Sequence, residues 1–193
     1  MQDLDGVRLD HGRASGAVLS GLPGGWEDGA VKEEEQATMA TWRELEATVP
    51  ALAKLGRAAL YRSDVGEGWL ATLRGGALPR IHPLNVGIVE GRLLVFVQPA
   101  SAKTRDLATD GRYALHAFQD PAVPHEFLVR GRATTVTDPA LRALAVAVWP
   151  FDPGDDYPLF ELGIEHVLYG ERGDPDTWPP RYSSWRAPAT GGV

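Results

Sequence analysis

Two apolar segments separated only by Glu90 and Gly91 constrain this chain more than any other part of its sequence. Residues 80–89 and 92–98 each have the length and composition of a strand, and the Glu-Gly pair between them favours a tight hairpin turn. Further short strands separated by turn residues are predicted along the rest of the chain. Closely spaced hairpins favour an antiparallel barrel over a parallel sheet.

The sequence predicts six to eight strands, and one of them contains a proline. Pro83 has no backbone N–H to donate, so its strand is expected at an edge or a bulge. The segments expected as strands are residues 58–62, 69–74, 80–89, 92–98, 112–118, 127–136, 159–171 and 182–186. The predicted fold class is mainly β with flanking helices, an α+β architecture.

Capping and breaking residues predict two helices before the first strand. Thr41 and Glu44 have the spacing of a capping box, so a helix is expected to begin there. Pro50 interrupts the apolar periodicity that follows, which predicts a corner and a second, short helix ending at Gly56.

Two more helices are predicted beyond the hairpin. One covers residues 101–109, between the fourth and fifth predicted strands. The other begins at Asp138 and Pro139, because aspartate is a good N-cap and proline suits the first helical position. The apolar face of this last helix is predicted to comprise Leu141, Leu144, Val148 and Trp149.

Composition divides the chain into a tail, a domain and a short second tail. Residues 1–40 are rich in glycine and acidic residues and lack periodic apolar positions, so a flexible N-terminal tail is predicted. The barrel domain is expected over residues 41–188, and residues 189–193 form a C-terminal tail.

Overall charge and missing residue types exclude several classes of function. The net charge of −7 disfavours nucleic-acid binding. No apolar run reaches the length of a membrane helix and no signal peptide is recognisable, so a cytoplasmic protein without membrane contact is expected. The chain has no cysteine, which excludes disulfides and thiolate metal sites. The five histidines lack metal-ligand spacing, and no Rossmann, P-loop or serine-hydrolase motif occurs, so no metal is predicted.

One group of polar residues suggests an anion site. Arg80 and His82 alternate along a strand and project from the same face. Ser101 and Lys103 open the helix after the next strand, where backbone N–H groups, a hydroxyl and an ammonium can meet a phosphate. A solvated basic face is the alternative interpretation of the same spacing.

The segment from about residue 45 to residue 142 resembles the pyridoxamine 5′-phosphate oxidase-like family of flavin-binding split barrels. The resemblance rests on Pro79-Arg80-Ile81-His82-Pro83-Leu84, Gly91-Arg92-Leu93-Leu94-Val95-Phe96-Val97, Ser101-Ala102-Lys103-Thr104-Arg105-Asp106-Leu107, Asp110-Gly111-Arg112-Tyr113-Ala114-Leu115 and Gly131-Arg132-Ala133. It implies a six-stranded antiparallel Greek-key barrel. It also implies a homodimer with flavin mononucleotide (FMN) at the subunit interface.

The resemblance also assigns cofactor-binding residues, although no catalytic residue. Arg80 to Leu84 would follow the isoalloxazine and ribityl chain, and Ser101 and Lys103 would bind the FMN phosphate. Glu126 would approach the flavin from the partner subunit. The full implied set is Arg80, Ile81, His82, Pro83, Leu84, Asn85, Phe96, Val97, Ser101, Lys103 and Glu126.

Departures from the family pattern bear on the substrate. Asn85 stands where the oxidases carry a lysine, Ala102 replaces a common arginine, and Leu144 and Val148 lie near the places of a tyrosine and an arginine. Without these cations a dianion binds poorly, so pyridoxine phosphate is not the expected substrate. The expected activity is two-electron hydride transfer to or from another small organic molecule.

Two alternatives use the same fold. A deazaflavin-dependent reductase would need positive charge at the mouth of the slot, which Arg74, Arg80 and Arg105 can supply. A non-catalytic flavin- or haem-binding module is the other. Its axial haem ligand would be one of His116, His125 and His166.

Overall fold

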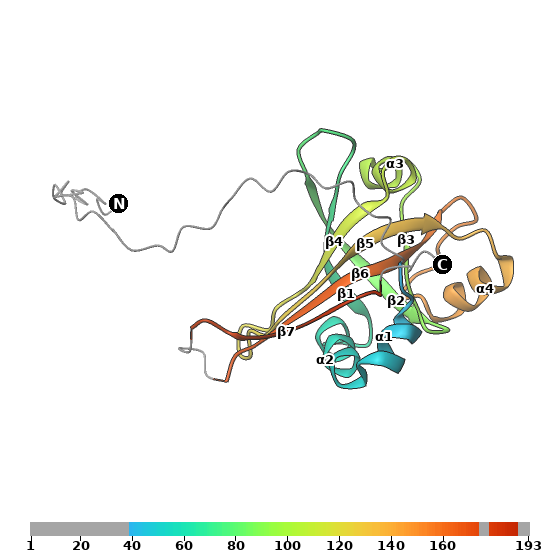
Figure 1. The fold of residues 1–193 in the computed structure, drawn as a ribbon. Coiled ribbons are helices and arrows are strands. Elements are labelled where there is room, and N and C mark those ends of the chain that lie inside the picture. The colour runs from blue at the N-terminus through green and yellow to red at the C-terminus, as the bar shows by residue number, and fades with distance from the viewer. Residues whose placement is uncertain (1–38, 174–177, 189–193) are drawn as a thin grey trace, which may run out of the picture. The chain divides into compact units, whose positions relative to one another are not determined.

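The computed structural model describes residues 39–173 and 178–188, which contain four helices and seven strands (Figure 1). Apart from residues 39 and 40, the predicted N-terminal tail lies outside the described residues, as does the predicted C-terminal tail. Among the described residues, no helix combines the length and the apolar composition needed to cross a membrane. The site of action in the cell remains a prediction.

Six strands close into an antiparallel barrel, as the sequence predicts. The strand order is β3-β2-β1-β4-β5-β6-β7, and β3 also pairs with β6, so β1 to β6 form the closed ring while β7 extends the edge of β6. The strands are β1 (Gly66–Thr72), β2 (Arg80–Val89), β3 (Arg92–Phe96), β4 (Arg112–Ala117), β5 (Glu126–Thr135), β6 (Leu159–Glu171) and β7 (Arg181–Arg186). The expected split-barrel architecture is confirmed.

Strand β6 is long because three segments share one of its edges. Residues 159–161 pair with β3, and residues 166–171 pair with β7. Between them Ile164 exchanges two backbone hydrogen bonds with Ala40, at 2.8 and 2.9 Å. Ala40, the last residue of the predicted tail, therefore covers the gap where β3 leaves the edge and β7 has not yet joined.

The central hairpin has the geometry that its sequence predicts. Glu90 and Gly91 both have positive φ, at 51° and 72°, as a primed two-residue turn requires. Pro83 pairs with Trp69 of β1, whereas β3 pairs with β2 only from Gly87 onward. Pro83 therefore faces the unpaired edge of β2, and the prediction of an edge position is confirmed.

The helices are α1 (Trp42–Thr48), α2 (Pro50–Leu60), α3 (Ala102–Thr109) and α4 (Pro139–Val148). Thr41 forms the predicted capping box with Glu44: the threonine oxygen accepts from the Glu44 N–H, and the Thr41 N–H donates to the glutamate carboxylate. Asp138 caps α4 by accepting from the Ala140 N–H at 2.8 Å.

Helix α2 corrects two predictions. It continues through Gly56 to Leu60, so no strand covers residues 58–62, and the first strand begins at Gly66 rather than Trp69. Gly56 is needed for packing and not for ending the helix, because a Cβ there would lie 2.3 Å from the Phe127 ring. This contact between α2 and β5 cannot be recognised in the local sequence.

Helix α4 turns a different face to the barrel from the one predicted. Leu141 and Ala145 are buried, together with the following Trp149, whereas Leu144 and Val148 are 48% and 66% exposed. The helix covers a small second core on the outside of β2 and β3. That core comprises Val89, Leu94, Phe96, Leu141, Ala145, Trp149 and Leu159.

Candidate anion-binding site

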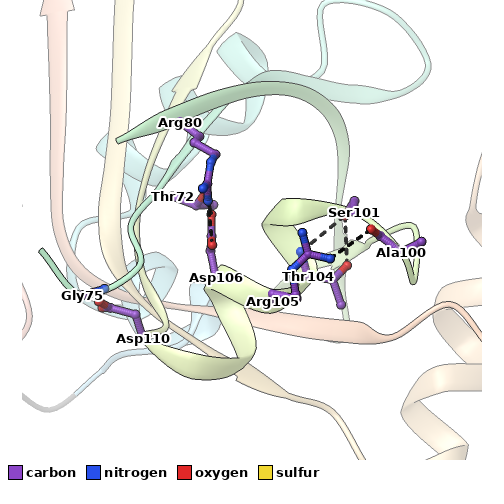
Figure 2. A network of polar contacts seen from close by, with 9 residues as sticks. All are labelled: Thr72, Gly75, Arg80, Ala100, Ser101, Thr104, Arg105, Asp106 and Asp110. Atoms are coloured by element: carbon purple, nitrogen blue, oxygen red, sulfur yellow. Dashed lines mark hydrogen bonds and ion pairs between the residues drawn. The ribbon is translucent and has the colours of Figure 1, made fainter. Parts of the chain in front are cut away.

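Helix α3 joins the end of β3 to the start of β4, and its first turn is fixed by two hydroxyls. The Ser101 hydroxyl accepts from the Thr104 N–H at 3.3 Å and lies 3.0 Å from the Thr104 hydroxyl. Thr104 in turn donates its hydroxyl to the Gln98 carbonyl at 2.7 Å. The loop after β3 and the first turn of the helix are therefore held as one unit (Figure 2).

Asp106, one turn further along α3, points at β1 and β2 (Figure 2). Its carboxylate is 1% exposed and accepts from Arg80 at 2.7 and 2.9 Å and from the Thr72 hydroxyl at 2.9 Å. Burial opposes ionisation, but these donors outweigh it and hold the pKa of the carboxyl below its ordinary value. Arg80 is thereby fixed on the inner face of β2.

At the last turn of α3, a second aspartate also accepts hydrogen bonds from an arginine and from one further donor. Asp110 accepts from the Arg112 side chain at 2.6 and 2.7 Å and from the Gly75 N–H at 3.0 Å. The Arg112 guanidinium is the main cause that lowers the pKa of Asp110 to about 2. This pair ties the loop between β1 and β2 to the helix.

Two basic groups differ from these pairs: Lys103, in the first turn of α3, and His82, on β2. Among the described residues, Lys103 makes no hydrogen bond or ion pair, and the buried Nε2 atom of His82 has no hydrogen-bond partner. Burial, and next the charge of Lys103, lower the pKa of His82 below its ordinary value. The Asp106 carboxylate acts in the opposite direction and the Arg80 guanidinium in the same direction as Lys103, so His82 lies within electrostatic reach of all three charges.

The arrangement suits an anion. Arg80 and Asp106 cancel each other, which leaves the Lys103 charge, the imidazole and the first N–H groups of α3. A phosphate oxygen can accept from these donors, and a negative charge there would favour the protonated form of His82. Of the residues predicted for this site, Arg80 is engaged by Asp106 of α3, and the role of Arg80, His82, Ser101 and Lys103 in binding a ligand stays a prediction.

The other predicted cofactor residues lie on two sides of the sheet. Arg80, His82 and Leu84 face inward, whereas Ile81, Pro83 and Asn85 face outward, with Ile81 69% exposed. The side chains of the two sets therefore point to opposite faces of β2.

Phe96 and Val97 lie in the interior. Phe96 packs edge-on against Trp149 with ring centroids 4.9 Å apart, and Val97 is fully buried in the barrel core. Their side chains are therefore not available to a ligand.

Glu126 lies at the far end of the same barrel. The strand register aligns Arg80 with Thr72, Tyr113 and Gly131. Glu126 is five residues from Gly131, about 17 Å along β5. Its carboxylate accepts from the Tyr182 hydroxyl at 3.0 Å. Within one chain it therefore does not belong to the Lys103 site.

Two residues that contact the predicted cofactor-binding residues were given no role in the sequence analysis. Asp106 was quoted in the resemblance but given no role, because a carboxylate between Arg105 and Leu107 has the pattern of an exposed helix position. Trp69 on β1 is 47% exposed on the outer face, and its ring lies 4.9 Å from that of Phe118. Its strand neighbour Pro83 pairs directly with it.

The histidines outside this site occupy separate positions. His116 Nδ1 lies 2.6 Å from the Ala117 carbonyl, and His125 Nδ1 accepts from the Arg172 N–H. Burial and neighbouring arginines lower the pKa of His166. In the described part of the chain, no group of three or more acidic or histidine residues is arranged to hold a metal ion.

Comparisons with known proteins support the fold alone. No family model matches the chain, and no curated protein matches it. Solved structures of similar fold include a heme binding protein from Mycobacterium smegmatis, with a TM-score of 0.53, 21% identity, and coverage of 68% of this chain and 57% of that protein. A protein of unknown function, Atu2129 from Agrobacterium tumefaciens, has a TM-score of 0.51 and 23% identity. The match covers 66% of this chain and 58% of that protein.

A NimC/NimA family protein from Clostridium acetobutylicum has a TM-score of 0.50 and 15% identity, with 67% of this chain and 91% of that protein covered. The chain spans little more than half the length of the first two of these proteins. Identities of this size establish a shared architecture and nothing finer. The split barrel expected from the resemblance is present, and membership of the family remains a prediction.

Proposed function

We propose that this protein binds FMN and transfers two electrons, as hydride, to or from a small organic molecule. The observation that carries the proposal is a pair of basic groups without partners among the described residues, Lys103 in the first turn of α3 and His82 Nε2 on β2, which feels the Lys103 charge. A phosphate monoester satisfies both groups together with the free helical N–H groups.

The phosphate end is held by three parts of the chain. Lys103 supplies the full charge, the first N–H groups of α3 supply direction, and His82 supplies a donor after taking up a proton. Ser101 keeps its structural bond to the Thr104 N–H and presents its hydroxyl at the same turn. Asp106 keeps Arg80 oriented toward this region without adding net charge.

The ring end requires an apolar surface, and the outer face of β1 and β2 provides one. Trp69, Ile81 and Pro83 are exposed there on adjacent strands. We propose that a second copy of the chain covers this face and that the cofactor lies at the seam. Glu126, which lies far from Lys103 in its own chain, would then act on the site of the second copy.

Bound FMN supplies the two-electron chemistry. The chain's residues bind it, orient it and exclude water, and no side chain is required as a base. Leu144 and Val148 are exposed and apolar, so α4 offers no cation to a substrate phosphate there. The proposed substrate is therefore a small organic molecule other than pyridoxine phosphate.

The experiment is mass spectrometry of the small molecule that co-purifies, followed by titration of the stripped protein with FMN and with a deazaflavin cofactor. We expect the co-purified molecule to be FMN, the purified protein to absorb at about 450 nm, and the stripped protein to rebind FMN saturably. Protein that carries no flavin and takes up neither cofactor would contradict the proposal. Tighter binding of the deazaflavin would favour the reductase alternative.

The distribution of cations favours FMN over the deazaflavin. Arg80 is paired with Asp106, and Arg105 donates to the Ala100 carbonyl at 3.3 Å. Two of the three arginines predicted to attract a longer acidic tail are thus already engaged. The proposed phosphate-binding site at Lys103 requires neither Arg80 nor Arg105.

A second candidate is haem binding without catalysis. A row of three basic side chains on the outer face of the sheet favours it. The strand register places Arg130, His166 and Arg186 side by side on β5, β6 and β7. Burial and the two arginines lower the pKa of His166, which favours the neutral imidazole that a metal ligand must be. Haem propionates would share these arginines with Glu165, which lies 3.5 Å from Arg130 and 4.0 Å from Arg186. One protein of similar fold is described as heme binding. A Soret band that His166→Ala abolishes would support this candidate.

A further inference from the structure

A cavity of about 310 Å³ lies between α2 and the loop that joins β4 to β5, away from the Lys103 site. Its walls are mostly apolar, with three polar residues among them. The lining residues are Leu55, Ala58, Ala59, Arg62, Phe118, Asp120, Val123, His125 and Tyr169. A small, largely apolar cavity with a few polar groups is the usual form of a small-molecule site.

One face of α2 creates the space. Leu55, Ala58 and Ala59 recur at helical spacing, and Arg62 continues the same face just beyond the end of the helix. Two of the three α2 residues that line the cavity are alanines, and their short side chains leave room beside the helix. Ala58 is exposed and Ala59 partly buried, so the cavity is open to solutes.

His125 is held in one tautomer beside this space. The Arg172 N–H donates to its Nδ1 at 3.1 Å, so the neutral ring carries its proton on Nε2. The ring also packs on Tyr169, with centroids 5.7 Å apart. The imidazole is thus oriented as a fixed hydrogen-bond donor.

Two opposite charges line the same cavity without neutralising each other. Among the described residues the Arg62 guanidinium has no hydrogen bond or ion pair, and the Asp120 carboxylate accepts only from the Ala122 N–H, at 2.9 Å. No ion pair joins Arg62 to Asp120. A ligand that carries both charges and an apolar body would use every polar group here.

We propose that this cavity binds an α-amino acid with a large apolar side chain. Arg62 and the Nε2–H of His125 face the carboxylate, Asp120 faces the ammonium, and the side chain lies against Phe118, Tyr169 and the alanines of α2. The cavity volume is at the lower end of the range for ligand sites, which suits a ligand of this size. The proposal does not depend on flavin binding.

The test is calorimetric titration of the whole protein with three probes: phenylalanine, 3-phenylpropionate, which lacks the ammonium, and phenylethylamine, which lacks the carboxylate. We expect phenylalanine to bind about fivefold more tightly than either analogue, because exposed charge pairs contribute at that level. Arg62→Gln should weaken phenylalanine about fivefold and leave phenylethylamine unchanged. Asp120→Asn should weaken phenylalanine and leave phenylpropionate unchanged.

A filling variant and its control test the location. Ala58→Leu occupies the cavity and should abolish binding, whereas Ala143→Leu, at an exposed alanine of α4 outside the cavity, should leave it intact. The proposal is overturned if phenylalanine shows no saturable binding, if either analogue binds as tightly as phenylalanine, or if the two leucine variants behave alike. A thermal melt of each variant identifies loss of folding.

Discussion

The charged groups at the two ends of α3 differ in whether they have partners. Toward the C-terminal end, Asp106 binds Arg80 and Thr72 (Figure 2), and Asp110 binds Arg112 and the Gly75 N–H, so both carboxylates are compensated. At the N-terminal end, Lys103 and His82 Nε2 have no partner in the described chain. Compensated charges stabilise a fold, whereas uncompensated ones are available to a ligand, so the two ends should respond oppositely to substitution.

The largest expected effect is on stability, from Asp106→Asn. This change leaves Arg80 without its counter-ion and weakens the bond from Thr72, so the free energy of unfolding should fall by about 2–3 kcal/mol. FMN affinity should not fall, because the proposed phosphate donors are Lys103, His82 and the first N–H groups of α3, and Asp106 binds none of them. Urea denaturation and a flavin titration measure the two quantities, with Asp64→Asn in an exposed turn as the control. Weaker FMN binding by the folded variant would break the comparison.

The next effect is on binding, from Lys103→Gln. Removing the unpaired ammonium should weaken FMN at least about tenfold, since a charge-assisted contact to phosphate is lost. Stability should change by less than about 0.5 kcal/mol, because the ammonium makes no bond in the folded chain. Lys54→Gln, an exposed lysine of α2, is the matched control. Equal FMN affinities for the two variants would refute the assignment.

A smaller effect appears in acid. The pKa of Asp110 is lowered in the folded chain from 3.8 to about 2, so its stabilising contribution is complete above pH 3.8 and lost as the pH falls toward 2. Asp110→Asn should therefore be less stable than the wild type at pH 5 by about 1 kcal/mol, with the difference shrinking toward pH 2. Unfolding curves across that range measure it. A difference that stays constant with pH would contradict the assignment.

The smallest effect is expected from His82→Leu. It removes a buried nitrogen that has no partner, so stability should stay level or rise by up to about 1 kcal/mol. The wild type should lose stability below about pH 6.5, because the unfolded chain then binds a proton more readily than His82 does, and the variant should lose less. A clear loss of stability at pH 8 would show that His82 has a structural partner.

The fold was largely predictable because its signals are local. The Glu90-Gly91 turn, the Thr41 capping box and the Asp138 cap each depend on residues that are neighbours in sequence. The errors arose where distant contacts decide the structure. Gly56 stays within α2 because the Phe127 ring approaches it from β5, which no local pattern reveals.

The site was predictable in part for the same reason. Strand alternation placed Arg80 and His82 on one face, and capping logic placed Ser101 at the start of α3. The partnership of Asp106 with Arg80 joins residues 26 positions apart, so the sequence did not show that one predicted cation is already neutralised. The side chains of residues 80–85 point to alternate faces of β2, as in any strand. The family resemblance nevertheless assigned all of them to one cofactor-binding site.

The most direct test of the proposed phosphate-binding site compares FMN with riboflavin, which has the same ring and no phosphate. The imidazole resonances of His82 are followed by NMR during titration with each compound at pH 7. FMN should bind more than about tenfold more tightly than riboflavin and shift the His82 nitrogens toward the protonated form. Equal affinities, or His82 signals that do not move with FMN, would contradict the account.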